Sequence, residues 1–381
     1  MRTRWKTHAI LARLQAELDE LQRADQFRKV GAVEGINLCS NDYLGLSDDP
    51  RLKLALTSAI ERQGERVCST GSRLLSGNSS QWEMLEAKAA SFVGAEAAVC
   101  FSSGYLANIG VLTSLLGPET TVFSDAANHA SIIDGIRLSR ANKVIFPHGD
   151  LQFLEEMLRA SNDTRERFIV VESVFSMDGD LAPIEDLYVL AARYDAGLIV
   201  DEAHATGVMG PNGRGIVAQS GRPDCVIATI HTCGKALAST GAFVACAETT
   251  RRYIVNKARS FIFSTALPPF AAEQISEALS IVAGEDERRR HLRLLSEYLR
   301  VELNSRGFDT SRSESHIVPV VLGSNDTALS VAQSLIDRGF GVKAIRPPTV
   351  PAGTARLRLS LTSRLRFDDL ATLVRALCDA R

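Results

Sequence analysis

The hydrophobic residues between positions 97 and 246 fall into short runs that are apolar almost without interruption. These runs are rich in Val, Ile and Phe, which is typical of β-strands buried on both faces of a sheet. The seven strands that this pattern predicts lie at 97–101, 121–124, 143–146, 168–172, 198–201, 226–230 and 242–246.

Between most of these runs the apolar residues recur with the spacing of a helix. The predicted helices include 82–92, 132–138, 151–159 and 184–194. Strands that alternate with helices predict an α/β fold, in which a mostly parallel seven-stranded sheet is covered by helices on both sides. Ligands of such sheets bind beyond the carboxyl ends of the strands, so the residues that follow each strand are the first candidates for a functional site.

An amphipathic helix is predicted near the N-terminus. Its apolar positions are Ile10, Leu14, Leu18 and Leu21. Charged residues of both signs lie between them, which disfavours a helix on a membrane surface, since such helices are normally basic on their polar side. We expect this helix to be an arm that packs on the main body.

The C-terminal part of the chain predicts a second, smaller α/β unit. Its predicted elements are helices at 268–282 and 285–306, a strand at 317–321, a helix at 327–338, strands at 342–345 and 355–361, and a last helix at 367–377. We therefore expect an N-terminal helical arm over 1–40, a large domain over 41–282 and a small C-terminal domain over 283–381.

Composition narrows the class of protein. Hydrophobic residues make up 45% and charged residues 23% of the 381 positions, which is the balance of a folded globular chain. The formal net charge of -2 offers no basic footprint for nucleic acid. No apolar run reaches the roughly 18 residues that a membrane span needs, and the first residues lack the apolar stretch of a secretory signal.

Cysteine and histidine spacing adds to this picture. The seven cysteines include no Cys-x-x-Cys pair, which fits reduced thiols in the cytoplasm better than a disulfide framework. The seven histidines include no pair at a metal-ligand spacing such as His-Glu-x-x-His, so no metal is expected. The composition thus indicates a soluble cytoplasmic enzyme that binds neither nucleic acid nor membrane.

The strand at 97–101 ends in a turn that could hold a phosphate. Ser102, Ser103 and Gly104 follow the strand, and a helix begins after them. The backbone N–H groups at such a helix start are unpaired and attract anions. Taken alone, the segment is better interpreted as an ordinary capped turn.

The strand at 198–201 ends in Asp201, which is followed three residues later by His204. A carboxylate at this edge could keep a heterocyclic nitrogen protonated, and His204 could donate to a ring oxygen. Asp201 could also be a helix cap, a metal ligand or the acid of a nucleotide site. No Gly-x-x-x-x-Gly-Lys-Ser/Thr loop exists in the chain, which weakens the nucleotide alternative.

Lys235 lies just past the strand at 226–230, among small residues. A lysine beside an apolar wall has a lowered pKa and acts as a nucleophile or base, whereas most lysines are solvent-exposed. A phosphate cradle, an acid for a ring nitrogen and a reactive lysine are together what pyridoxal phosphate requires.

Two further patterns indicate chemistry less clearly. Glycines recur at Gly207, Gly210, Gly213 and Gly215 without the spacing of a dinucleotide site, and we interpret them as a flexible loop. The arginine-rich stretch 288–293 is interpreted as a solvated helix face, with a docking patch for an acidic carrier protein as the alternative.

Seven segments, in order along nearly the whole chain, resemble those of the α-oxoamine synthases, which are pyridoxal-phosphate enzymes of the aspartate-aminotransferase fold (fold type I). The segments are SNDYLGL at 40–46, GSRLLSG at 71–77, SGYLAN at 103–108, NHAS at 128–131, VFSMDGD at 174–180, DEAH at 201–204 and HTCGKA at 231–236. The resemblance implies the fold just predicted, with pyridoxal phosphate as the cofactor.

The resemblance also implies catalytic and cofactor-binding residues. Lys235 would hold the cofactor as a Schiff base and move the proton at the substrate Cα, Asp201 would pair with the ring nitrogen, and His129 would stack on the ring. The remaining implied cofactor contacts are Ser176 and His204 on the hydroxyl side of the ring, and Ser103, Gly104, Tyr105 and Thr232 around the phosphate and ring.

Substrate and subunit contacts follow from the same resemblance. Asn41 and Arg358 would hold an amino-acid carboxylate, with Arg356 as the alternative to Arg358. Arg28 and Thr349 would meet an acyl substrate. Two residues that follow the lysine segment, Ser264 and Thr265, would reach the phosphate of a partner subunit, which implies a homodimer with shared active sites.

Within the family, the segment IRPPTVPAGTARLR at 345–358 is most similar to that of members that join L-alanine to a pimeloyl thioester in biotin synthesis. The acyl group would arrive on coenzyme A or an acyl carrier protein. The alternatives are another condensing member, of the glycine C-acetyltransferase or serine palmitoyltransferase type, and a non-catalytic subunit on the same fold. The presence of Lys235 disfavours a non-catalytic subunit.

Overall fold

The computed structural model describes residues 9–62, 67–161, 166–220 and 226–381. All seven strands expected between positions 97 and 246 are present and form one sheet. In spatial order they are β2 (Ala97–Phe101), β8 (Ala242–Cys246), β7 (Val226–Thr232), β6 (Ala196–Asp201), β5 (Glu166–Glu172), β3 (Thr120–Asp125) and β4 (Asn142–Phe146). Only β8 runs antiparallel to its neighbours, which confirms the mostly parallel sheet.

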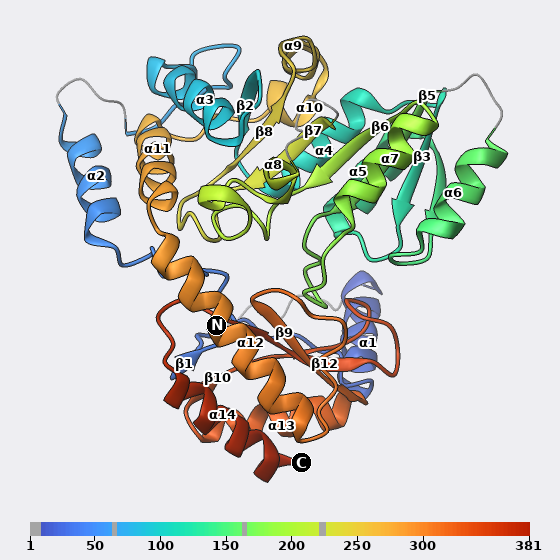
Figure 1. Cartoon of the computed structure of the whole chain (residues 1–381), viewed down its shortest axis with the longest axis vertical. Coiled ribbons are helices and arrows are strands. Elements are labelled where there is room, and N and C mark those ends of the chain that lie inside the picture. Colours follow the sequence, from blue (N-terminus) through green and yellow to red (C-terminus); the bar gives the residue numbers. More distant parts are fainter. Residues whose placement is uncertain (1–8, 63–66, 162–165, 221–225) are drawn as a thin grey trace.

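Helices cover both faces of this sheet (Figure 1). The helices of this body are α2 (Pro50–Glu61), which packs on α11, and α3 (Ser80–Val93), α4 (Gly104–Leu115), α5 (Ala130–Ser139), α6 (Leu151–Ala160), α7 (Ile184–Arg193), α8 (Ile216–Gln219), α9 (Glu248–Lys257), α10 (Arg259–Ile262) and α11 (Pro269–Ala283). Successive side chains of a strand point to opposite faces of the sheet, and two neighbouring residues of β3 show this. Val122 packs in a core cluster with α4 and α5, whereas Phe123 packs in a separate cluster with α6 and α7.

The prediction that every strand is buried on both faces is wrong for β4. This strand lies at the edge of the sheet, where it has one neighbour, β3. Asn142 and Lys143 are exposed, and Ile145 is exposed as well. An edge strand is covered less completely than a central one, and charged or polar residues there discourage pairing with another chain.

The C-terminal residues form a second body, which lies below the first in Figure 1. Its helices and strands are α12 (Asp286–Ser305), β9 (Ile317–Gly323), α13 (Asn325–Asp337), β10 (Phe340–Gly341), β11 (Ala344–Ile345), β12 (Ala355–Ser360) and α14 (Phe367–Ala380). β11, β12 and β9 form an antiparallel sheet, and β1 (Ile36–Asn37) pairs with β10. The domain boundaries at 40 and 282 stay predictions.

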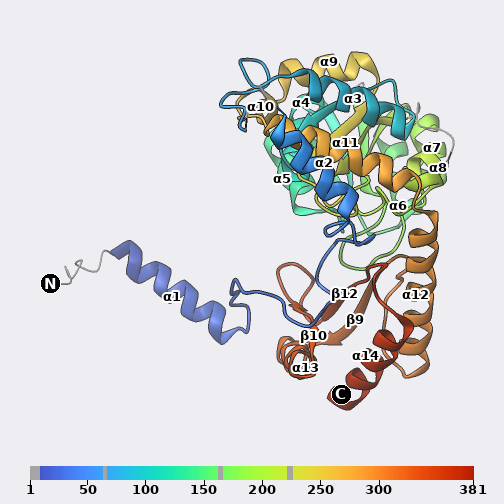
Figure 2. The ribbon, with the colours of Figure 1, turned by 90° about the vertical axis from the view of Figure 1, so that its left-hand side faces the viewer.

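The N-terminal helix α1 (Ala9–Arg23) extends away from the rest of the chain (Figure 2). None of its residues is buried, and Leu14, Leu18 and Leu21 are at least 40% exposed. The expectation that this helix packs on the main body is therefore wrong within a single chain. The apolar side chains do lie on one helix face, as the sequence periodicity predicts, but the segment that follows carries the helix outward. In the part of the chain that the structure describes, no helix has the length and apolarity to span a membrane.

A histidine between two aspartates holds together loops at the carboxyl edge of the large sheet. His148 follows β4, and its Nδ1 lies 2.9 Å from Oδ1 of Asp125, the last residue of β3. Its Nε2 lies 2.7 Å from Oδ2 of Asp180, in the loop beyond β5. The hydrogen bonds to Asp125 and Asp180 raise the pKa of His148 to about 10. The imidazole is therefore positively charged at neutral pH and stabilises this edge.

We predict that His148→Gln lowers the free energy of unfolding by roughly 1.5–3 kcal/mol near neutral pH, the range for a hydrogen bond to a charged group. The folded pKa of about 10 exceeds the unfolded value of about 6.5. The contribution is thus complete below about pH 6.5 and is lost as the pH rises through about 10. Urea unfolding of wild type and variant at about pH 6.5 and at about pH 10.5 measures how much of the His148 contribution is lost.

The matched control is His291→Gln, because the His291 ring is bonded to the carbonyl of Leu365 instead of to a carboxylate. The loss of unfolding free energy at neutral pH should be smaller in this control than in His148→Gln, because hydrogen bonds to a carboxylate are stronger than one to a carbonyl. A His148→Gln difference that stays constant up to about pH 10.5 would contradict a charged His148.

Candidate active site

Asp201 is the last residue of β6 and lies at the carboxyl edge of the large sheet. Asn108 of α4 donates from Nδ2 to Asp201 Oδ2 over 2.7 Å, and the backbone N–H of Ala203 donates to Oδ1 over 2.8 Å. The residue is 5% exposed. Because each carboxylate oxygen accepts a hydrogen bond from a fixed donor, the orientation of this carboxylate is set before any ligand binds.

Lys235 lies beyond the end of β7, and its Nζ is 2.8 Å from Nε2 of His204. Nδ1 of the same histidine is 2.6 Å from the hydroxyl of Tyr43, and this hydroxyl donates to Oδ1 of Asn41 over 2.9 Å. Since the tyrosine proton is used on Asn41, His204 donates from Nδ1, and its Nε2 accepts a hydrogen bond from Lys235. The lysine amine is thus held by a chain of three side chains.

The electrostatic surroundings favour the neutral amine of Lys235. Burial lowers its pKa to about 8, and the positive charge of Arg358 acts in the same direction, against the carboxylates of Asp201 and Glu172. Burial and the charge of Lys235 lower the pKa of His204 well below its usual value, so that ring is neutral. An amine with this pKa is available as a nucleophile or base near physiological pH.

Arg358 reaches this cluster from β12, in the second body. Its Nη1 donates to Oδ1 of Asn41 over 3.1 Å, and its Nε donates to the carbonyl of Ser176. The alternative residue, Arg356, is buried and forms an ion pair with Asp178. The charge of Arg356 is thus already paired with a carboxylate, whereas the acceptors of Arg358 are neutral. The geometry therefore favours Arg358 as the residue that meets a substrate carboxylate.

The start of α4 has the properties of a phosphate site. Ser103 is its N-cap residue, and Oγ of Ser103 accepts from the backbone N–H of Leu106 over 3.2 Å. Gly104 lies against Thr232, where a Cβ atom would stand 2.3 Å from the threonine Cγ2, so no other residue fits without displacement. The unpaired N–H groups of this first turn, with the helix dipole, attract an anion.

His129 lies at the N-cap of α5 and is linked to Asp201 through Asn108. The histidine Nδ1 is 2.7 Å from Oγ of Ser131, and Asn108 donates to the same hydroxyl over 2.9 Å. Burial lowers the pKa of His129. The ring of Tyr105 stands nearly perpendicular to that of His129, with centroids 6.4 Å apart. One asparagine therefore orients two of the residues that the sequence resemblance implies for the cofactor.

The two residues implied for the acyl substrate come together although they are 321 positions apart. Nη2 of Arg28 donates to Oγ1 of Thr349 over 3.1 Å, and both side chains are exposed. No hydrogen bond between described residues joins this pair directly to Lys235. The pair is a separate polar group, with the charge to contact an anionic end of a substrate.

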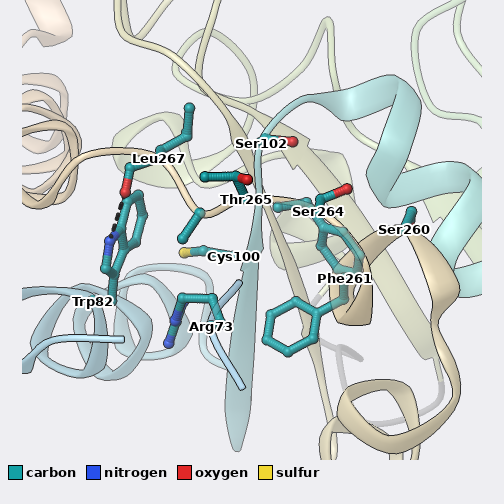
Figure 3. A pocket seen from close by; sticks show the side chains of 11 residues that line it. Arg73, Trp82, Cys100, Ser102, Ser260, Phe261, Ser264, Thr265 and Leu267 are labelled. Atoms are coloured by element: carbon teal, nitrogen blue, oxygen red, sulfur yellow. Dashed lines mark hydrogen bonds between the residues drawn. The ribbon is translucent and has the colours of Figure 1, made fainter. Parts of the chain in front are cut away.

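Ser264 and Thr265 lie beside Ser102, around a small cavity that Arg73 and Trp82 also line (Figure 3). The indole Nε1 of Trp82 donates to the carbonyl of Leu267 over 3.3 Å and ties this segment to α3. The two hydroxyl side chains are thus close to the end of β2, next to the phosphate cradle. Their contact with the cofactor of a partner subunit stays a prediction.

Three residues of the cluster were not among the predicted site residues: Tyr43, Asn108 and Glu172. Tyr43 and Asn108 are within segments that carry the family resemblance, but sequence alone gives no orientation for them. Glu172 ends β5 and lies opposite Asp201 in the parallel register. Its Oε1 has no hydrogen-bond partner among the described residues, and burial raises its pKa to about 8. Its position at the carboxyl end of a buried strand is the sequence feature that could have identified it as a site residue.

Comparison with known proteins agrees with this geometry. Residues 33–377 match the family model for aminotransferase class I and II. An 8-amino-7-oxononanoate synthase from Burkholderia vietnamiensis is 45% identical over 362 residues, which cover 93% of this chain and 89% of that protein. A protein of the same name from Burkholderia cenocepacia is 45% identical over 357 residues, covering 92% and 87%.

Solved structures lead to the same family. A serine palmitoyltransferase from S. paucimobilis, solved with a bound PLP–myriocin aldimine, superposes with a TM-score of 0.89 at 29% identity and covers 98% of both chains. An 8-amino-7-oxononanoate synthase from Francisella tularensis gives a TM-score of 0.78 at 28% identity, covering 91% of this chain and 97% of that one. The chain therefore belongs to the aminotransferase class I and II family, on the branch of the 8-amino-7-oxononanoate synthases.

Proposed function

We propose that the enzyme condenses L-alanine with a pimeloyl thioester to give 8-amino-7-oxononanoate in biotin synthesis. The observation that carries this proposal is the 45% identity over 93% of the chain with curated enzymes of that name, in a chain that retains Lys235 and its partners. In the reaction the alanine Cα bonds to the acyl carbon and the thiol leaves. The alanine carboxylate departs as carbon dioxide, and a proton returns to Cα.

Pyridoxal phosphate is the cofactor of the enzyme, and the residues at the edge of the large sheet fit it. Gly104 lets the phosphate approach the backbone N–H groups of α4, because a side chain there would collide with Thr232. Asp201 has a fixed orientation suited to a protonated ring nitrogen, and Lys235 supplies the amine. When bound, the cofactor withdraws electrons from the bonds at the amino-acid Cα.

Different residues of the chain carry out proton transfer, carboxylate binding and cofactor binding. Lys235 removes the proton at Cα and later returns one, which a pKa near 8 allows. Arg358 and Asn41 hold the alanine carboxylate and thereby select which bond at Cα is broken. His129 contacts the face of the cofactor ring. Four residues contribute further cofactor contacts: Tyr105, Ser176, His204 and Thr232.

Arg28 and Thr349 bind the acyl substrate, which is carried on coenzyme A or an acyl carrier protein. Burial lowers the pKa of Arg346, and the positive charge of Arg28 lies near enough to act in the same direction. Guanidinium groups remain charged at neutral pH, so this pair makes its end of the site cationic. A cationic end suits the free carboxylate of a pimeloyl chain. We place the reaction in the cytoplasm, and the free state of the six cysteines among the described residues supports this location.

A serine palmitoyltransferase function is the second candidate, because those structures superpose with the higher TM-score. The TM-score measures how well backbones coincide and contains no information about the side chains of the site. Sequence identity favours the first candidate, at 45% against 29%.

We also propose a homodimer with shared active sites. Leu75 and Phe263 are 84% and 70% exposed, and Ser264 directly follows the second of these. The apolar face of α1 is exposed as well. Apolar groups of this size are normally covered in a soluble protein, and a second copy that covers them would bring Ser264 and Thr265 to its own cofactor phosphate.

The test of the proposed function is a product assay with amino acids and acyl thioesters in all combinations. We predict that alanine with pimeloyl thioester gives a kcat/KM at least about tenfold above glycine with acetyl thioester or serine with palmitoyl thioester. Equal or higher turnover of glycine with acetyl-coenzyme A would overturn the assignment and leave the fold intact.

The same assay separates the two arginines. Arg358→Lys should raise the KM for alanine at least about tenfold, because an ammonium cannot replace the two-pronged guanidinium contact with a carboxylate. Arg356→Lys is the matched control on the same strand, and its KM for alanine should change less than about threefold. A larger increase in the KM for alanine in Arg356→Lys than in Arg358→Lys would assign the substrate carboxylate to Arg356.

The shared site predicts that activity depends on subunit association. Light scattering and product assays over a dilution series should show specific activity falling as the dimer dissociates. A monomer with full specific activity would contradict the dimer proposal.

A further inference from the structure

Two sequence features that the active site does not use meet at one cavity. The first is the glycine-rich loop, residues 207–215, which extends from the sheet body. The second is the arginine stretch, residues 288–293, on α12 of the second body. Residues of both segments line one cavity of about 590 Å³, which is within the range of small-molecule sites. α12 runs on the side of the molecule opposite to α1 (Figure 2).

The walls of this cavity are ordered, contrary to the sequence interpretation of both features. In the glycine-rich loop the N–H of Gly207 donates to the carbonyl of Gly213 over 2.7 Å, and the N–H of Gly215 donates to that of Met209 over 2.9 Å. In the arginine stretch Arg289 is 9% exposed and donates to the carbonyl of Val282. The loop is thus a closed turn, and the stretch is more than a solvated helix face.

Charge in the cavity is predominantly positive. Arg289, Arg290, Arg293 and Arg300 line it, against the carboxylates of Asp286 and Glu314. Arg289 is paired with Asp286. No hydrogen bond or ion pair of Arg290 occurs among the described residues, and Arg293 reaches Glu297 only at 3.8 Å. The guanidinium of Arg290 is therefore free to bind an anion, and that of Arg293 is held only by this long ion pair.

A buried imidazole without hydrogen bonds lies in the cavity wall. His316 is 2% exposed, and neither ring nitrogen has a hydrogen-bond partner in the part of the chain that the structure describes. Burial lowers its pKa to about 3, so the ring is neutral and offers one donor and one acceptor. A buried polar group without a partner is unfavourable, so a bound molecule that pairs with this ring would recover the lost hydrogen bonds.

The remaining wall is apolar and comes from Leu181, Val208 and Met209. We propose that the cavity binds a small organic carboxylate whose anionic group meets Arg290, Arg293 and Arg300, and whose apolar body lies against these three side chains. The same anionic group accepts a hydrogen bond from the N–H of the neutral His316 ring, which lies near the charge of Arg300. The arrangement of a few polar groups in a largely apolar pocket is typical of small-molecule sites.

This cavity is distinct from the active site but shares a neighbour with it. The ring of His316 stands against that of Tyr43, with centroids 3.9 Å apart. Tyr43 is the residue whose hydroxyl is bonded to His204, the partner of Lys235. A ligand that pairs with His316 therefore acts on the hydrogen-bonded chain that ends at the catalytic lysine, and the cofactor absorbance reports its binding.

The test is a calorimetric titration of the holoenzyme with sodium heptanoate, followed in parallel by the visible absorbance of the cofactor. We expect one saturable site per chain. The double variant Arg290→Gln with Arg293→Gln should weaken binding at least about tenfold. His316→Phe, which keeps the ring against Tyr43 and removes both nitrogens, should also weaken it.

Two control variants show whether heptanoate binds in this cavity or elsewhere on the enzyme. Arg375→Gln removes an exposed arginine of α14 and should leave heptanoate binding unchanged. Arg358→Lys alters the active site and should leave it unchanged as well. Loss of binding in Arg358→Lys with binding retained in the double variant would place heptanoate in the active site and overturn the proposal.

Two further outcomes would also overturn it. The absence of saturable heptanoate binding in the millimolar range would mean that the cavity holds water alone. Inorganic phosphate that binds as tightly as heptanoate, with the same loss in the double variant, would show that the apolar wall plays no part.

Discussion

The site depends on one constraint, which is that a lysine amine must be buried enough to be neutral and yet held in a fixed direction. Lys235 meets it through the lone pair of His204, the hydroxyl of Tyr43 and the nearby charge of Arg358. A fully exposed lysine would stay protonated at neutral pH, and one buried in apolar surroundings without such partners would have no fixed position.

The constraint explains why the two bodies must be docked. Lys235 and His204 come from loops at the edge of the large sheet, whereas Arg358 comes from β12 of the second body. Tyr43 precedes the sheet body in the chain and is fully buried between them. The parallel direction of β5, β6 and β7 brings three strand ends to one edge, so that Glu172, Asp201 and Lys235 become neighbours.

Much of this arrangement could be predicted from the sequence, because it depends on local patterns. The buried strands are short apolar runs, and the residues that follow them, Asp201 and Lys235 among them, were found by the rule that ligands bind at strand ends. The exposure of β4 and the outward path of α1 could not be predicted, because they depend on which neighbour a segment lacks. The same is true of Asn108 and His316, whose importance lies in contacts between segments far apart in the chain.

The central claim is that the amine of Lys235 performs the proton transfer, and replacement by alanine tests it most directly. Purified Lys235→Ala should retain pyridoxal phosphate without a covalent bond, because the start of α4 and Asp201 are intact, while condensation falls by at least about 10²-fold. Lys88→Ala is the matched control, since burial also lowers the pKa of Lys88, which contacts Ser276 and Ser280 instead. Turnover of alanine and pimeloyl thioester by Lys235→Ala within about tenfold of wild type would contradict the account.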